Sequence, residues 1–328
     1  MEKRQGFKYL RIRTFSFILL FFITCLPGCI KNNAANHYPD NPLFKLTYHT
    51  QWSRVAAVPL QFNAFHTQGM VKVGEYFYMS SVEVFRWPKQ YDRPQGKLDR
   101  DPGEGRGHIF KFDKDGNLLQ DLLIGEGNVY HPGGLDYDGK YIWVPVTEYR
   151  PHSFSVIYKV DPETMEATEV MRYDDSIGAI AHDTDDNALI GVNWDAREFY
   201  RWSFDGRGNI TNASVAPEIL GVKRGSHYVA YQDCQYLGNR LILCSGHQSY
   251  KCENGLFRLG GWEIIDLKDF RPVHQIPVRL WSPSGAPVTN NPCAVEFTER
   301  GIVAYFVPDD DEKSVLLVYE IDIYSYSY

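Results

Sequence analysis

The sequence predicts an all-β protein, a five-bladed β-propeller, and three observations support this fold class. A short pattern recurs five times, each copy is followed by a hairpin signal, and no stretch keeps an amphipathic helical period over three or more turns. The pattern is a small polar or imidazole residue, two variable positions, Gly or Ala, and a large apolar residue. Its copies begin 45 to 65 residues apart, at His66, His131, Ser176, His227 and Asn291.

Each copy continues through an apolar run into a tight-turn signal and a second run rich in β-branched and aromatic residues. In the first repeat the turn is Gly74-Glu75, and Gly or Asn recurs in the later turns at 138–139, 186–187, 238–239 and 300–301. Such residues supply the positive φ that hairpin turns need. Third and fourth strands follow in the middle repeats, with outer strands expected at 118–124, 169–173, 217–222 and 273–278.

The two ends of the domain complete the ring. Residues 44–62 contain a strand with no repeat before it, and residues 314–323 form a third strand with no fourth after it. Pairing them closes the last blade and removes both exposed sheet edges. Extra length at 84–107, 245–255 and 280–290 is expected as long loops. A ring of six blades is the alternative, if one of these loops hides further strands.

The N-terminus predicts a secretory signal. Lys3, Arg4, Lys8, Arg11 and Arg13 precede an apolar run at 15–23 that is short for a membrane span. The following Leu26-Pro27-Gly28-Cys29 resembles a bacterial lipobox; a plain signal peptide or a short anchor is the alternative. The resemblance implies a signal peptide at 1–28, a lipid such as palmitate on Cys29, a tether at 29–43 and a propeller at 44–328.

This reading places the protein in the bacterial cell envelope, with its acylated Cys29 in the lipid bilayer. Ile30, rather than an acidic residue, follows Cys29, which favours the outer membrane, on its periplasmic side or at the surface. Loss of residues 1–28 removes five positive charges and one negative charge, so the formal net charge falls from −7 to −11. Such an acidic domain argues against nucleic acid as a partner. We expect a monomer.

Four cysteines follow Cys29 in the sequence. In an oxidising compartment they can form up to two disulfides in three pairings, and a zinc site is the rival interpretation. No Cys-x-x-Cys pair occurs, so disulfides or buried thiols are favoured. The four are Cys234, Cys244, Cys252 and Cys293.

The propeller fold predicts a ring of polar side chains at one mouth of the central channel. The innermost strand of a blade starts at one face and the second strand returns to it, so the residues that open the repeats meet those that end the second strands. The second set lies 13 residues after the apolar anchors, with an offset in the fourth repeat. It comprises Glu83, Glu148, Asn193, His247 and Asp309, the last of these only approximately placed.

Neutral imidazoles beside carboxylates suit a general acid/base pair or one divalent metal ion. We predict Glu83, Glu148, His66 and His131 as catalytic groups, and His66, His131 and His227 as metal ligands. Ligand contacts are expected from His227, His247, Asn193, Asp195, Asn291 and Asp309. Taken singly, a His or Asn that opens a strand more often caps neighbouring backbone groups.

Aromatic residues in or beside the loops above the mouth are candidates for stacking on a ring-bearing ligand. They are Trp87, Tyr149, Trp194, Tyr250 and Trp281, and packing within the loops is the alternative role. Several familiar chemistries are not indicated, because the sequence contains no Gly-x-Ser-x-Gly, His-Glu-x-x-His or Gly-Lys-Ser/Thr motif.

The stretches at 66–70, 79–83, 130–136 and 143–149 together resemble a family of secreted bacterial proteins known only as a domain of unknown function. The resemblance extends over most of 44–322 and implies a propeller without an established activity. A fainter resemblance is to the propeller-type glutaminyl cyclases, five-bladed enzymes. It rests on Thr67-Gln68-Gly69-Met70 and Gly125-Glu126-Gly127, and His66 stands where that family commonly has Phe.

The sequence therefore predicts an envelope lipoprotein whose mouth binds a small molecule or peptide, as a hydrolase or lyase that uses a metal ion. A non-catalytic binding or scaffold module of the envelope is one alternative, and a glutaminyl-cyclase-like enzyme is another. Fold alone does not decide among them.

Overall fold

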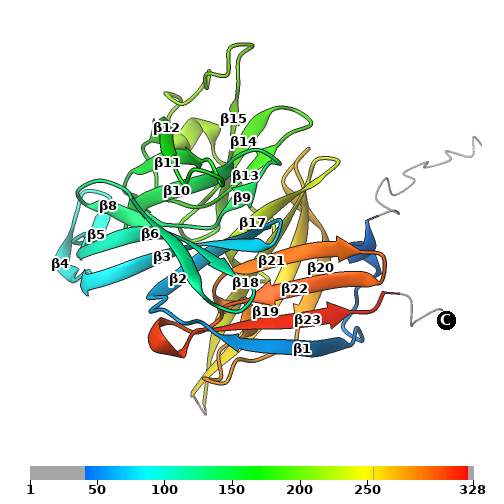
Figure 1. Cartoon of the computed structure of the whole chain (residues 1–328). Helices are drawn as coiled ribbons and strands as arrows, with labels where there is room; N and C mark the ends of the chain where they lie inside the picture. Colours follow the sequence, from blue (N-terminus) through cyan, green and yellow to red (C-terminus); the bar gives the residue numbers. More distant parts are fainter. Residues whose placement is uncertain (1–40, 254, 324–328) are drawn as a thin grey trace, which may run out of the picture. The chain divides into compact units, whose positions relative to one another are not determined.

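The computed structural model describes residues 41–253 and 255–323, and it confirms a five-bladed β-propeller (Figure 1). The predicted signal peptide, Cys29 and most of the tether lie outside the described residues. Blade 1 is the sheet β2-β3-β6-β7, and blade 2 is β8-β10-β11-β12, in which β9 also pairs with β10. Blades 3 and 4 are β13-β14-β15-β16 and β17-β18-β19-β20.

Blade 5 joins the two ends of the domain, as predicted. Strand β1 (Trp52–Pro59) pairs antiparallel with β23 (Val315–Ile321), next to β22 (Gly301–Phe306) and β21 (Cys293–Thr298). A short 3-10 helix, η1 (Pro42–Lys45), precedes this blade. The closure needs no residue before 41, so we treat 40–328 as a unit that folds by itself.

The remaining elements follow the order of the blades. Blade 1 contains β2 (His66–Val73), β3 (Tyr76–Arg86), β6 (Glu104–Asp113) and β7 (Leu118–Ile124); blade 2 contains β8 (Val129–Pro132), β9 (Asp136–Tyr137), β10 (Ile142–Glu148), β11 (Ser155–Val160) and β12 (Ala167–Tyr173). Blade 3 contains β13 (Ile177–Asp183), β14 (Ala188–Asn193), β15 (Glu198–Ser203) and β16 (Val222–Lys223); blade 4 contains β17 (Ala230–Gly238), β18 (Leu241–Cys252), β19 (Gly255–Asp266) and β20 (Arg271–Val278). Helices η2 (Val288–Asn290) and η3 (Asp311–Lys313) lie in loops.

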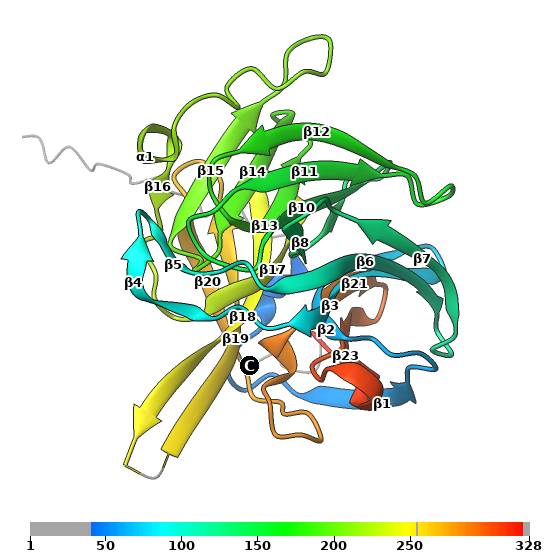
Figure 2. The same cartoon turned by 90° about the vertical axis from the view of Figure 1, so that its left-hand side faces the viewer.

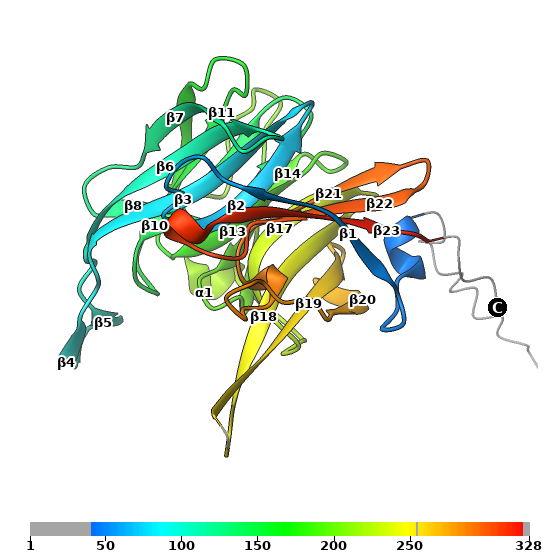
Figure 3. The ribbon, with the colours of Figure 1, turned by 60° about the horizontal axis from the view of Figure 1, so that its bottom comes forward.

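Two of the expected loops contain strands. Residues 84–107 form the end of β3, a small hairpin of β4 (Gln90–Gln95) and β5 (Leu98–Arg100), and the start of β6. In the expected loop at 245–255, β18 continues to Cys252 and β19 begins at Gly255, which makes a two-stranded ribbon that projects beyond blade 4 (Figure 2). Figure 3 shows both hairpins projecting on the same side of the propeller.

The prediction of an outer strand at 217–222 is wrong. The chain instead forms a short helix, α1 (Pro217–Leu220), followed by the two-residue strand β16. Pro217 has no N–H to donate to a sheet, whereas the first turn of a helix leaves that donor unpaired anyway. The amide of Gly221 then donates to the Pro217 carbonyl at 2.8 Å.

A buried carboxylate ties the blades together at the centre. Asp233 of blade 4 accepts hydrogen bonds from the amides of Met70 (2.9 Å), Leu135 (2.9 Å) and Cys293 (3.2 Å), which belong to blades 1, 2 and 5. Its side chain is only 2% exposed, and burial raises the pKa of this carboxyl well above its usual value. An inner strand that faces a channel has amides with no partner strand on that side. Asp233 accepts hydrogen bonds from three such amides, which would otherwise be buried without a partner.

Candidate functional site

The mouth of the channel holds a small polar pocket of about 170 Å³. The openings of the inner strands of blades 1 to 4 meet there, as the propeller geometry predicts. Its lining residues are His66, Gln68, His131, Tyr149, Gly178, Trp194, Tyr231 and Gln232.

One histidine of the pocket lining pairs with a carboxylate that lies behind it, outside the lining. The Nδ1 atom of His66, at the start of β2, lies 2.9 Å from Oδ2 of Asp310, in the loop after β22. An ionised carboxylate only accepts, so in the neutral imidazole this contact favours the tautomer with the hydrogen on Nδ1 and the lone pair on Nε2. Asn291 Nδ2 donates to the other oxygen of Asp310 at 2.8 Å, and the amide of Thr67 lies 3.4 Å from the same oxygen. Asp310 is therefore oriented from two blades.

The second histidine of the pocket is kept neutral. His131, at the end of β8, is 6% exposed, and its Nδ1 has no hydrogen-bond partner. Burial, and secondarily the nearby His66, lower the pKa of His131 to about 3. A neutral imidazole has one donor and one acceptor, and the protein leaves one of these buried groups unused.

Aromatic rings form one wall of the mouth. The Tyr149 ring lies 4.2 Å from His131 and 5.7 Å from Trp194, measured between ring centroids. Trp87, which is 60% exposed, lies 5.7 Å from Tyr149 and 6.3 Å from His66. Because rings attract at such separations, the wall is a connected cluster with one open face at Trp87.

The floor of the pocket is fixed from blade 4. The hydroxyl of Tyr231 donates to Glu263 Oε2 at 2.5 Å, and the guanidinium of Arg224 packs 4.2 Å from the Tyr231 ring. Burial, with Glu263 adding to it, raises the pKa of Tyr231 well above its usual value. Tyr231 thus stays a neutral, rigid side chain.

Neither predicted catalytic glutamate lines the pocket, and both pair with cations. Glu148 accepts from Arg150 Nε at 2.6 Å, and Arg150 also donates to the carbonyl of Arg100 at the end of the β4–β5 hairpin (3.1 Å). Glu83 lies 3.6 Å from both Arg106 and His108. In β3 its neighbour Val82 pairs with His66, and successive side chains of a strand point to opposite faces.

The two other predicted histidines lie apart from the pocket lining. His227 Nδ1 accepts from Arg197 Nη1 at 3.0 Å in an exposed position. His247 sits in β18 opposite Ala230, with a buried Nδ1 that has no partner. Burial, and secondarily Arg258, lower the pKa of His247.

The predicted amide and aspartate ligands have structural roles around the mouth. Asn193 Oδ1 accepts from the amides of Arg197 and Glu198, which shapes the loop after β14. Asp195 and Asn193 line a separate hollow of about 450 Å³ on blade 3. Ser176 donates to the Arg150 carbonyl at 2.8 Å.

Counting along the sequence predicted Asp309 at the mouth, whereas the next residue, Asp310, is the one that contacts His66. Asp309 accepts from Ser282 Oγ at 2.7 Å and also from Ser284, whereas Asp310 reaches His66. The loop after β22 departs from strand alternation there, so a count of 13 residues did not fix the side-chain direction. Gln232 was also missed, and nothing in the repeat pattern singles it out.

The described ranges 41–253 and 255–323 contain no group of three or more His, Cys, Asp or Glu side chains placed to hold a metal ion. His66 and His131 share the pocket, with ring centroids 6.3 Å apart, but His227 does not line it. The metal set predicted from His66, His131 and His227 thus finds no support in the arrangement of these side chains.

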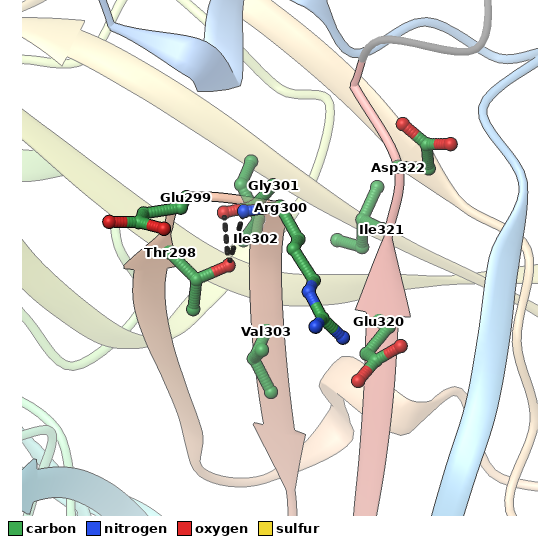
Figure 4. A pocket seen from close by; sticks show the side chains of 9 residues that line it. All are labelled: Thr298, Glu299, Arg300, Gly301, Ile302, Val303, Glu320, Ile321 and Asp322. Atoms are coloured by element: carbon green, nitrogen blue, oxygen red, sulfur yellow. Dashed lines mark hydrogen bonds between the residues drawn. The ribbon is translucent and has the colours of Figure 1, made fainter.

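A larger hollow, of about 520 Å³, lies in blade 5 at the β21–β22 turn and the end of β23 (Figure 4). Thr298 Oγ1 there accepts from the amide of Arg300 and donates to the Gly301 carbonyl, both at 3.2 Å. The turn uses this hydroxyl for its own backbone, whereas the mouth pocket brings together side chains from four blades.

The four cysteines pair only in part. Cys234 and Cys244, on neighbouring positions of β17 and β18, form a disulfide, whereas Cys252 is an exposed thiol and Cys293 a buried one. No helix among the described residues is long and apolar enough to cross a bilayer.

Comparisons with solved structures find several at low identity. They include a tail fibre of Staphylococcus aureus phage P68 (TM-score 0.44, 10% identity, 84% of this chain and 53% of that one) and a luciferin-regenerating enzyme (0.43, 10%, 83% and 95%). A Kuenenia stuttgartiensis hydrazine synthase chain follows (0.35, 9%, 76% and 57%). The chain spans just over half the length of the tail fibre and of the hydrazine synthase chain.

No curated protein matches the sequence significantly. Residues 25–324, however, match a family of unknown function, DUF6454, along most of the chain. This agrees with the resemblance carried by the motifs around His66 and His131. The chain belongs to the DUF6454 family of unknown function.

Proposed function

We propose that the protein is an enzyme of the bacterial cell envelope that uses His66 as a general base on a small or peptidic substrate in the mouth pocket. The hydrogen bond between His66 Nδ1 and Asp310 carries this proposal, because it leaves Nε2 as the proton acceptor. Proton abstraction from water gives hydrolysis, and abstraction from the substrate gives elimination or cyclisation. The imidazolium that forms is stabilised by Asp310.

The surroundings of His66 suit this role. Asn291 restricts rotation of the Asp310 carboxylate. His131, whose pKa is lowered to about 3, does not compete for the proton at neutral pH. The pocket volume of about 170 Å³ matches a single ring or one amino-acid side chain, since an engineered cavity of about 150 Å³ accepts benzene. Trp87 offers an exposed ring face on which a substrate can stack.

Peptide N-termini are the substrate class to test first. The matched probes are a glutaminyl dipeptide, whose cyclisation releases ammonia, and an aminoacyl p-nitroanilide, whose hydrolysis releases the coloured amine. Gln68 of the Thr67–Met70 stretch lines the pocket, which favours including the cyclisation probe. We expect turnover of one probe, a loss of about 10²-fold or more in kcat for His66→Ala, and a comparable loss for Asp310→Asn.

The control is His49→Gln, an exposed histidine whose ring has no role at the mouth. Turnover that survives His66→Ala unchanged contradicts the proposal. If the wild-type domain turns over neither probe, the peptide substrate class is wrong.

We also propose that Cys29 is acylated and anchors the domain to the bilayer. The lipobox-like 26–29 supports this, and the Cys234–Cys244 disulfide is consistent with an oxidising compartment. Metabolic labelling with an alkyne fatty acid should modify the wild-type chain and not Cys29→Ala. Equal labelling of both chains contradicts the anchor.

A further inference from the structure

The ribbon formed by the ends of β18 and β19 exposes large apolar side chains. Tyr250 is 44% exposed, Leu256 55% and Phe257 52%, and Trp281 in the adjacent loop is 50% exposed. Leu256, Phe257 and Trp281 line one hollow of about 400 Å³. The ribbon projects from the mouth side of blade 4 (Figures 2 and 3).

Both faces of the ribbon carry apolar groups. Tyr250 pairs with Phe257 and so shares a face with it, while Lys251 pairs with Leu256 on the opposite face. A flat protein partner covers one face of a ribbon and leaves the other in water. A fluid apolar medium that surrounds the tip covers both faces at once.

Basic side chains accompany these apolar groups. Lys251, Arg258 and Arg279 are on or beside the ribbon, and Glu253 is the one acidic residue of the tip. This local excess of positive charge stands in a chain whose formal net charge is −7. Aromatic and aliphatic side chains flanked by Lys and Arg suit the interface of an anionic bilayer, where the rings sit at the headgroup level and the cations meet lipid phosphates.

We propose that the tip of this ribbon, residues 249–253 and 255–258, inserts into the interfacial layer of an anionic lipid bilayer. The depth is limited to the interface. Beyond His247 and Gly260 the outer edges of β18 and β19 have no neighbouring strand among the residues that the structure describes. Such backbone groups need water. The insertion orients the mouth toward the membrane surface.

The place where the described chain begins also favours a bilayer near blade 4, if Cys29 carries the proposed lipid. The described chain begins beside blade 4, where His274 of β20 contacts the Leu46 carbonyl at 2.8 Å. Eleven residues lie between Cys29 and Asn41, and a fully extended chain over these twelve Cα–Cα steps spans at most about 43 Å. A lipid on Cys29 would hold blade 4 within that reach of a bilayer.

Cys252 provides a direct test at the tip. It is the exposed free thiol of the described residues, whereas Cys293 is buried and the other two form the disulfide. The domain 40–328, which lacks Cys29, is labelled at Cys252 with an environment-sensitive fluorophore. It is mixed with vesicles of phosphatidylglycerol and phosphatidylethanolamine, or of phosphatidylcholine alone. We expect a blue shift and co-sedimentation with the anionic vesicles, both weaker at high salt.

The variants separate the apolar from the charge contribution. Leu256→Glu should weaken vesicle binding at least about tenfold. The double variant Lys251→Gln/Arg258→Gln should also weaken vesicle binding, by about fivefold for each basic side chain removed. The matched control is Leu123→Glu, because Leu123 of β7 is also 55% exposed but lies in blade 1, outside the ribbon. It should bind like the wild type.

Other outcomes overturn the proposal. One is the absence of a blue shift with anionic vesicles. Another is an equal loss of vesicle binding in Leu256→Glu and Leu123→Glu. The third is a concentration-dependent dimer that Leu256→Glu abolishes. The dimer would make a second copy the occupant. His66→Ala should leave vesicle binding unchanged, so a failure here is distinguishable from failure of the proposed catalysis or, since Cys29 is absent, of the anchor.

Discussion

His66 and Asp310 form a hydrogen bond of 2.9 Å although 244 positions separate them in the sequence. His66 opens the first repeat, and Asp310 follows the second strand of the last one. They meet because β1 and β23 close the ring and bring blade 5 beside blade 1. The pair therefore depends on ring closure.

The tautomer of His66 is the first prediction. Because Asp310 accepts from Nδ1, neutral His66 should carry its hydrogen there, and the ring ¹⁵N shifts should show a protonated Nδ1. In Asp310→Asn the amide can also donate, so the Nε2–H form should gain population. Long-range ¹H–¹⁵N spectra measure this, with His49 as the internal reference. Unchanged ring shifts in the variant would show that the contact is absent in solution.

The second prediction concerns His131 and pH. Its folded pKa, about 3, lies below the ordinary value of 6.5, so between these values the unfolded chain binds a proton that the native chain does not. The free energy of unfolding should therefore fall on acidification through this window, by up to roughly 1.4 kcal/mol per pH unit from this group. Urea unfolding at several pH values, compared with His131→Gln, isolates the contribution. Parallel curves for the two chains contradict it.

Of the buried carboxylates, Asp233 should be the one whose replacement lowers the free energy of unfolding most. Asp233→Ala leaves three buried amides without acceptors, each costing about 1 kcal/mol or more, so we expect a loss of about 3 kcal/mol or more in the free energy of unfolding. Asp205→Asn, at an exposed turn, is the control. Chemical denaturation of both variants checks the difference, and similar midpoints would refute the central role of Asp233.

Thiol reactivity tests the cysteine assignment. In the domain 40–328, one thiol should react with a water-soluble disulfide reagent under native conditions and two in denaturant, because Cys252 is exposed and Cys293 is buried. Burial, with Asp233 adding to it, also raises the pKa of Cys293 well above its usual value, which slows its reaction further. Cys252→Ser should abolish the native reaction. Four reactive thiols in denaturant would rule out the Cys234–Cys244 disulfide.

Arg150 should hold the β4–β5 hairpin against blade 2. It donates to the Arg100 carbonyl at 3.1 Å and to Glu148 at 2.6 Å. Arg150→Ala removes the contact with the hairpin and leaves Glu148 without a partner, so limited proteolysis should cut within 87–103 faster than in the wild type. Arg207→Ala, at an exposed turn, should leave the cleavage rate unchanged. Equal cleavage in Arg150→Ala and the wild type counts against this role.

The sequence by itself determined the ring of five blades and, to within three residues, where their inner strands begin. The repeat pattern, the hairpin turns and the unmatched strands at both ends are local or periodic signals, and β1 paired with β23 as expected. It also predicted that His66 and His131 share one mouth, because both open a sequence repeat and that position faces the same end of the channel in every blade.

Only the tertiary structure decided which groups act together. Glu83 and Glu148 are bound by Arg106 and Arg150, and a sequence does not reveal which cation reaches which carboxylate across strands. Asp310 replaced Asp309 because the loop after β22 breaks strand alternation, so the side-chain direction no longer follows from counting. The sequence predicts a loop at 245–255, where the structure has a ribbon, because strand pairing beyond the blade depends on backbone hydrogen bonds, which composition does not encode. The repeats fixed the positions along each blade, and the packing of blades against one another fixed the contacts.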